Sequence, residues 1–245
     1  MSAAPRGFPA RVFSWAKRGL CLAICVFLLV QFWFFAWILW WKWTPPTETR
    51  FMRLRLAELR QQDPEASLRH QWVDYARISR HLKRAVIVAE DARFVDHDGF
   101  DWAGIQAAIE KNREKGRFVA GGSTLTQQLA KNLFLSPRRS LLRKGQEALI
   151  TLMLEALWDK QRIFEVYLNV IEWGNGVFGA EAAARHYYQT GAASLSSWQA
   201  ARLAAMTPNP RYYDARRKTA YLTYRTASIH AQMPAARLPV RRAED

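Results

Sequence analysis

Residues 19–41 read GLCLAICVFLLVQFWFFAWILWW, and Gln31 is the only strongly polar side chain among them. A helix of this length crosses a hydrocarbon core of about 30 Å. Four basic residues and no acid precede this stretch, and tryptophans crowd its second half, where an aromatic belt would meet the membrane surface. The pattern predicts a single membrane anchor over 19–43, with residues 1–18 in the cytoplasm and the rest of the chain outside it.

A cleaved signal peptide is the alternative interpretation of the same segment. A signal peptide has an apolar core of roughly 7–15 residues, followed by small residues at the cleavage site. The segment seen here is longer, and it ends in WILWWKW, which offers no such site. We therefore expect an anchor that stays on the chain.

Composition limits what the part outside the membrane contains. About 200 of the 245 residues follow the anchor, which is enough for one compact domain. Both cysteines, Cys21 and Cys25, lie inside the anchor, which excludes a disulfide scaffold or a thiolate metal site beyond it. The net charge of +15 indicates an anionic partner, such as a membrane surface or an anionic substrate. The expected topology disfavours nucleic acid.

Helical spacing of apolar residues dominates the chain beyond the anchor, and no convincing strand pattern is present. We expect an irregular membrane-proximal lead-in over 44–78, one helical domain over 79–233 and a polar tail over 234–245. The helix that follows Asp101 is expected to bury Ile109. Residues able to cap helix N-termini mark the predicted helix starts: Ser79, Asp101, Thr124, Ser140 and Ser196.

The first chemical feature is a pair of acids, Glu90 and Asp91, at the end of an apolar helix. Acids are unfavourable there, because the C-terminal end of the helix dipole is negative. A carboxylate at the end of a buried helix and facing a cleft is partly desolvated, which makes it a better general base. The alternative is a surface acid paired with Arg93.

The second feature is the segment GGSTLTQQ at residues 121–128, which combines two glycines with a helix start. Glycines before a helix N-terminus let a ligand approach the backbone closely, and the hydroxyls and amides are neutral partners for sugars and phosphates. An ordinary capped helix would show the same residues, so that alternative stays open on this segment alone.

The third feature is cationic. Residues 111–144 contain nine lysines and arginines against one acid, Glu114. Glu147 follows one helical turn after Arg143 and Lys144. Those charges would keep Glu147 ionised, which favours a polarising role over that of an acid. Ordinary ion pairs on a helix surface are the alternative.

Together these features resemble the ordered motifs of the family-51 peptidoglycan glycosyltransferases, from about Ser79 to Tyr213. The motifs are EDARFVDHDGFD at 90–101, GGSTLTQQ at 121–128, RKGQE at 143–147 and EVYLN at 165–169.

The chain is similar to the monofunctional branch, the biosynthetic transglycosylases, and we expect no transpeptidase domain after the match. The family's final motif is only partly present, at Arg225, Ile229 and Met233, with His230 in place of a leucine.

The resemblance implies a mainly α, lysozyme-like helical domain with a small membrane-proximal lobe. It implies that lipid II is polymerised into glycan strands and that undecaprenyl pyrophosphate is released. The growing strand is the donor, and the 4-hydroxyl of the incoming lipid II attacks it. Attack opposite the leaving group converts an α-linkage into a β-linkage.

The resemblance also assigns roles to individual residues. Glu90 is the expected general base, and Glu147 is the second essential carboxylate, which orients the cationic cluster. Charge on the leaving pyrophosphate would be neutralised by Lys131, Arg139, Arg143 and Lys144. The other residues expected to position sugars and phosphates are Asp91, Phe94, His97, Ser123, Thr124, Gln127, Gln128 and Asn132.

No dedicated cofactor or metal site is expected, although a divalent cation, Mg²⁺ or Mn²⁺, could bridge the pyrophosphate and the carboxylates. The expected partners are lipid II, the growing strand, membrane lipids and other cell-wall synthesis proteins. The expected location is the bacterial inner membrane, with the catalytic domain in the periplasm. A lytic, lysozyme-like enzyme and a non-catalytic scaffold for wall synthesis are the alternatives. Neither explains the cationic run, the anchor and both carboxylates together.

Overall fold

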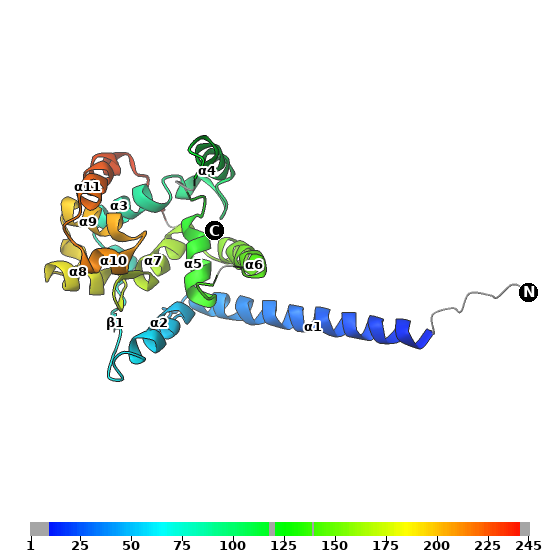
Figure 1. Ribbon diagram of the computed structural model, residues 1–245. Coiled ribbons are helices and arrows are strands. Elements are labelled where there is room, and N and C mark those ends of the chain that lie inside the picture. The colour runs from blue at the N-terminus through cyan, green and yellow to red at the C-terminus, as the bar shows by residue number, and fades with distance from the viewer. Residues whose placement is uncertain (1–9, 118–120, 139, 241–245) are drawn as a thin grey trace, which may run out of the picture.

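The computed structural model describes residues 10–117, 121–138 and 140–240. The first helix, α1 (Ala10–Trp41), extends away from a compact helical domain and meets it only near the C-terminal end of the helix (Figure 1). Its segment Lys17–Trp41 is long and apolar enough to cross a membrane, judged by length and composition. The helix therefore begins earlier than the predicted anchor and ends at nearly the same place.

The domain consists of short helices around a small three-stranded sheet. In the sheet, β3 lies in the middle, parallel to β1 and antiparallel to β2. The helices are α2 (Arg50–Arg60), α3 (Arg80–Glu90), α4 (Trp102–Glu114), α5 (Leu125–Phe134), α6 (Leu141–Leu157), α7 (Lys160–Val170), α8 (Ala180–Tyr188), α9 (Ser197–Met206), α10 (Pro210–Ala215) and α11 (Ala220–Gln232). The strands are β1 (Arg69–His70), β2 (Glu172–Gly174) and β3 (Val177–Phe178).

Two helical groups share one hydrophobic core. On one side α3 packs against α9 and α11, and on the other α5 packs against α6 and α7 (Figure 1). The large side chains buried in this core include Trp173, Tyr167 and Phe164. The mainly helical fold is confirmed. The two groups meet where α3 ends and α5 begins, and this junction positions the candidate site.

Three local predictions were wrong. The segment 44–78 is not irregular, because it contains α2, which Thr49 caps by accepting a hydrogen bond from the Met52 N–H at 3.1 Å, and it also contains β1. The strands went unpredicted because two or three residues are too few to show alternation. Ile109 is 62% exposed, because α4 lies at the edge of the domain (Figure 1).

Polar contacts hold the C-terminal part of α1 against the domain. Gln31 and Gln146 of α6 exchange two amide hydrogen bonds, of 2.9 and 3.0 Å. The Trp158 indole donates to the carbonyl of Ile38 at 2.8 Å, and the Arg162 guanidinium donates to that of Trp41 at 2.7 Å. Contacts at three positions along α1 therefore fix its orientation relative to α6 and to the start of α7.

Asn169, at the end of the fourth motif, fastens the segment after β1 to α7. Its amide accepts a hydrogen bond from the Val73 N–H and donates to the carbonyls of Val73 and Glu165, each at 2.9 Å. Asn169 is fully buried. Gly179 crosses over it so closely that an added Cβ would lie 2.7 Å from the Asn169 carbonyl oxygen. The motif therefore has a structural reason for its asparagine.

Asn169→Ala should lower the free energy of unfolding by about 2–4 kcal/mol, because the buried backbone groups of Val73 would lose their partners. Denaturant titration in detergent micelles, followed by circular dichroism, measures this loss. Asn209→Ala is the matched control, because Asn209 is exposed and makes no side-chain capping bond to α10. Equal stability of the two variants would contradict the proposed role of Asn169.

Candidate active site

Glu90 is the last residue of α3, and its half-buried carboxylate is held from two sides. Gln128 of α5 donates a hydrogen bond from Nε2 to Oε2 at 2.9 Å, and the Thr207 hydroxyl donates to Oε1. Tyr167 in turn donates to the amide oxygen of Gln128 at 3.2 Å, which fixes the orientation of that amide. These contacts fix the orientation of the Glu90 carboxylate.

The C-terminal end of α3 tolerates its acids because cations lie nearby. The guanidinium of Arg225 in α11 donates to the Ala89 carbonyl at 3.1 Å, and so binds one of the free carbonyls at the negative end of α3. Ile229 of the same helix is fully buried. The partial C-terminal motif therefore still docks α11 beside the site. Arg93 pairs with Asp101 at 3.3 Å, so the surface-pair alternative for Glu90 and Asp91 is wrong.

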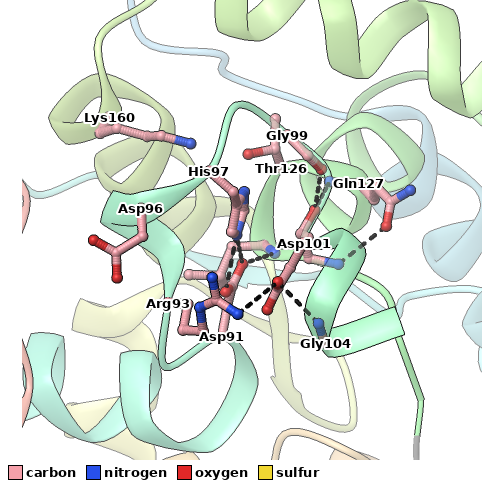
Figure 2. A network of polar contacts seen from close by, with 12 residues as sticks. Asp91, Arg93, Asp96, His97, Gly99, Asp101, Gly104, Thr126, Gln127 and Lys160 are labelled. Atoms are coloured by element: carbon pink, nitrogen blue, oxygen red, sulfur yellow. Dashed lines mark hydrogen bonds and ion pairs between the residues drawn. The ribbon is translucent and has the colours of Figure 1, made fainter. Parts of the chain in front are cut away.

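Asp91 points inward and joins two helices (Figure 2). Nε2 of His97 lies 3.1 Å from both carboxylate oxygens, and the N–H of Leu125, the first residue of α5, donates to Oδ2 at 3.0 Å. Only 4% of the Asp91 side chain is exposed. Phe94 is fully buried, with its ring centroid 5.7 Å from that of Phe164. These contacts position the junction, and direct contact of Asp91, Phe94 or His97 with a substrate stays a prediction.

In the GGSTLTQQ segment, some side chains form the helix cap and others remain accessible or reach Glu90. Thr124 and Gln127 form the predicted capping box, and the Thr124 hydroxyl donates to the Gly99 carbonyl at 2.7 Å. Both side chains are buried, so the ordinary-cap interpretation accounts for them. Ser123 is exposed at the start of α5, and Gln128 reaches Glu90. Asn132, one turn later, donates from Nδ2 to the Gln128 carbonyl at 2.9 Å.

Two cavities lie near Glu90, which itself lines the smaller of the two. One, of about 200 Å³, is lined by Glu90, Arg93, Asp101 and the residues from Gly121 to Thr124. The other, of about 390 Å³, is lined by both side chains that hold the Glu90 carboxylate, Gln128 and Thr207, and by Lys131, Asn132 and Arg211. Glu90 therefore faces one cavity directly and is linked to the second through Gln128 and Thr207.

The cationic cluster surrounds a second buried carboxylate, that of Glu147. Oε2 of Glu147 lies 2.5 Å from the Arg143 guanidinium, and Oε1 is bound by the Lys144 ammonium. Only 5% of the Glu147 side chain is exposed, so the surface-pair alternative is wrong. Arg139, which belongs to the same predicted set, lies outside the described residues.

Lys131 projects from α5 near both carboxylates. Burial lowers the pKa of its ammonium, with Glu147 opposing the shift, Arg143 adding to it, and weaker effects from Glu90 and Lys144. Among the described residues, the Lys131 ammonium has no hydrogen-bonded or ion-paired partner. A partly buried ammonium of this kind is well suited to neutralising an incoming anion.

Within the described ranges, no group of three or more histidines, cysteines, aspartates or glutamates could hold a metal ion. The expectation of a divalent cation accompanying a pyrophosphate therefore stays a prediction.

Sequence reasoning missed two residues that contact the base or its partner. Thr207 lies in a turn after α9, 117 residues from Glu90, and no motif marks it. Tyr167 belongs to the EVYLN motif but received no role, although its buried hydroxyl reaches Gln128. In the sequence, the only indication of a role for Tyr167 was a polar side chain within a buried helix. The sequence gave no indication of a role for Thr207.

Comparison with known proteins adds an independent finding. Residues 57–234 match the family model described as Transglycosylase. The chain is 67% identical over 225 residues to a protein of Dechloromonas aromatica, covering 92% of this chain and 97% of the relative. It is 62% identical over 222 residues to a protein of Methylobacillus flagellatus (91% and 97% covered) and 58% over 228 residues to one of Laribacter hongkongensis (93% and 100%). All three relatives are named biosynthetic peptidoglycan transglycosylase.

Lys131→Met should raise the free energy of unfolding at pH 7 by more than about 0.5 kcal/mol, the usual limit for an exposed substitution. Because folding lowers the Lys131 pKa, the charged form costs stability below that pKa. The advantage of the variant should shrink as pH rises through the lowered pKa towards the ordinary value of 10.5. Denaturant titrations across this range, with exposed Lys111→Met as control, measure it. A loss of stability at pH 7 would show that attraction to Glu147 and Glu90 outweighs the cost of burial.

Proposed function

The chain belongs to the transglycosylase family. From this family membership and from the geometry of the site, we infer that it is a peptidoglycan glycosyltransferase. It polymerises lipid II into glycan strands and releases undecaprenyl pyrophosphate. The relatives are covered almost end to end and are named for transglycosylation alone. The observation that supports the assignment of roles below is that Glu90 lines one cavity, while its partners Gln128 and Thr207 line a second cavity together with Lys131 of the cationic cluster.

Glu90 acts as the general base in this proposal. It takes the proton from the 4-hydroxyl of the incoming N-acetylglucosamine while that oxygen forms a bond to the anomeric carbon of the donor. The anomeric carbon releases the pyrophosphate oxygen on the opposite face, so the product linkage is β. Gln128 and Thr207 hold the carboxylate in position for this transfer. A positioned base typically contributes about 10²–10⁴-fold to the rate.

The cationic cluster stabilises the leaving pyrophosphate. Negative charge grows on the bridging oxygen as its bond to the sugar breaks, and Lys131, Arg143 and Lys144 neutralise it. Glu147 binds Arg143 and Lys144 and so holds two of these cations in place before the substrate arrives. An enzyme that cleaves finished glycan releases no pyrophosphate and does not need the cluster. The site therefore supports synthesis over the lytic and scaffold alternatives.

The orientation in the membrane is also part of the proposal. The N-terminus lies in the cytoplasm and the catalytic domain in the periplasm, at the inner membrane, because basic residues precede the spanning segment. Leu141 of α6 is 91% exposed, consistent with contact between α6 and membrane lipids. Contact with other cell-wall synthesis proteins stays a prediction.

Glu90→Gln should abolish strand growth from lipid II, a loss of at least about 100-fold, because the amide keeps the shape of the side chain but cannot accept a proton. The measurement is gel sizing of products from labelled lipid II, and lysozyme should digest the products of the wild-type chain. Glu110→Gln, on the exposed face of α4, is the matched control. Near-normal synthesis by a folded Glu90→Gln variant would reject Glu90 as the base.

Two substitutions of Thr207 test whether its hydroxyl supports the function of Glu90. Thr207→Val keeps the shape but removes the hydroxyl that donates to Glu90, and should reduce kcat by about 3–30-fold. Thr207→Ser should largely restore it. Equal activity of the two variants would remove Thr207 from the mechanism. Shortening of finished, lipid-free strands with no growth from lipid II would instead favour the lytic alternative.

A reporter that is active only outside the cytoplasm, fused after Asp245, should be active in intact cells. The expected reason is the basic lead before the anchor, so replacing Arg6, Arg11, Lys17 and Arg18 by acids should weaken the signal. A reporter that works only in the cytoplasm should be silent at the same position. Activity of that second reporter would overturn the orientation.

A further inference from the structure

One cation that lines a cavity near the proposed base has no role in the reaction described above. Arg211 of α10 lines the cavity of about 390 Å³ together with Lys131, Gln128 and Thr207. It lies outside the four family motifs, and its side chain is 45% exposed. Because Lys131 is assigned to the pyrophosphate, Arg211 is available for a different group of the same substrate. We call the part of this cavity around Arg211 the Arg211 subsite.

Two acids hold the guanidinium of Arg211 in a fixed position. Its Nε lies 3.2 Å from Oε2 of Glu172 in β2, and its Nη1 lies 3.6 Å from Oε2 of Glu58 in α2. Only 5% of the Glu172 side chain is exposed. A guanidinium has five N–H donors, so the two acids do not use its full capacity. The side chain is therefore oriented before a ligand arrives, which reduces the entropic cost of binding.

Arg55 of α2 compensates the same two acids. It donates from Nε to Oε1 of Glu172 at 3.2 Å and from Nη1 to Oε2 of Glu58 at 2.6 Å. Burial raises the pKa of Glu172. Arg211, the Gly176 N–H and Arg55 oppose this rise in pKa. The Arg55 side chain is only 12% exposed, and Arg55 is absent from the described residues that line the cavity. The two arginines thus share their acids but differ in their access to a ligand.

The chemistry of the substrate indicates which group reaches Arg211. Lipid II carries a peptide with free carboxylates on the sugar that is bonded to its pyrophosphate. In the proposed reaction Lys131 neutralises that pyrophosphate, so the sugar and its peptide begin within a few bonds of the cavity that Lys131 and Arg211 share. A planar guanidinium matches the geometry of a carboxylate, which it can bind through two parallel hydrogen bonds.

We propose that Arg211 binds a carboxylate of the peptide on the donor, so that the enzyme recognises the donor by its peptide as well as by its pyrophosphate. The proposal rests on the function proposed above, because it uses Lys131 as part of the pyrophosphate site. Amidation of the peptide carboxylates should therefore weaken binding of the donor, whereas loss of Arg211 should make binding insensitive to that amidation.

Binding of a donor mimic tests the proposal without requiring turnover. The probe is undecaprenyl pyrophosphate that carries one N-acetylmuramyl peptide, either with free carboxylates or with every peptide carboxylate amidated, and the full-length protein is held in nanodiscs of neutral lipid. We expect the wild type to bind the free-acid probe at least about fivefold more tightly than the amidated probe, as one charge-assisted contact allows. Equal dissociation constants for the two probes would overturn the proposal.

Arg211→Gln and Arg55→Gln form a matched pair, because each removes one of the two arginines bound to Glu172 and Glu58 and leaves the other. Arg211→Gln should reduce the preference for the free-acid probe to less than about twofold, whereas Arg55→Gln should keep it. Both folded variants, checked by circular dichroism, should bind undecaprenyl pyrophosphate without a sugar as the wild type does. An equal loss of preference in both variants would assign Arg211 a structural role alone. Weaker binding of undecaprenyl pyrophosphate by folded Arg211→Gln would make Arg211 a pyrophosphate ligand. Either result would overturn the proposal.

Strand growth from lipid II separates this proposal from the proposed function. Arg211→Gln should lower kcat/KM at least about fivefold for lipid II with free peptide carboxylates and less than about twofold for fully amidated lipid II. A binding preference in a wild-type protein that builds no strands would reject the proposed function and keep the Arg211 subsite. Normal strand growth with equal kcat/KM for the two forms of lipid II would reject the subsite and keep the function.

Discussion

The carboxylate of Asp91 joins the end of α3 to the start of α5, and the position of the groups around Glu90 depends on that junction. It accepts hydrogen bonds from the His97 ring and from the first N–H of α5, so a negative charge meets the positive end of the α5 dipole. With the helices locked, Gln128 on α5 reaches Glu90 at the tip of α3. An acid buried for a structural reason thereby positions the neighbouring acid that we propose as the general base.

The buried charges of the site are unequally compensated, and in the proposed reaction the substrate would supply what is missing. Glu147 is buried but compensated by Arg143 and Lys144, whereas burial lowers the pKa of Lys131 against the opposing effect of Glu147. A pyrophosphate would supply the missing negative charge. In the proposed reaction such a cluster would stabilise the leaving group with little reorganisation, because its cations are already partly desolvated and oriented.

The docking of α1 on α6 links this electrostatic arrangement to the membrane. The Gln31–Gln146 amide pair fixes α6, which carries the cluster, relative to the segment that can span the bilayer, and the Trp158 and Arg162 contacts do the same for the end of α6 and the start of α7. A lipid-borne substrate has its anionic and apolar parts at a fixed spacing. A rigid connection between the cationic cluster and the anchor can match that spacing, which a flexible tether could not maintain.

The sequence by itself determined the apolar anchor segment, the helical class, the capped starts at Ser79, Thr124, Ser140 and Ser196, and the ion pairing of Glu147, because each depends on residues within about one or two helical turns. It also indicated the family and singled out Glu90, whose role as base remains a proposal. Only the tertiary structure decided that Asp91 points inward, that Thr207 reaches Glu90 and that the anchor forms a wall of a cavity. These contacts join residues from 34 to more than 100 positions apart, and no local pattern specifies which distant side chains will meet.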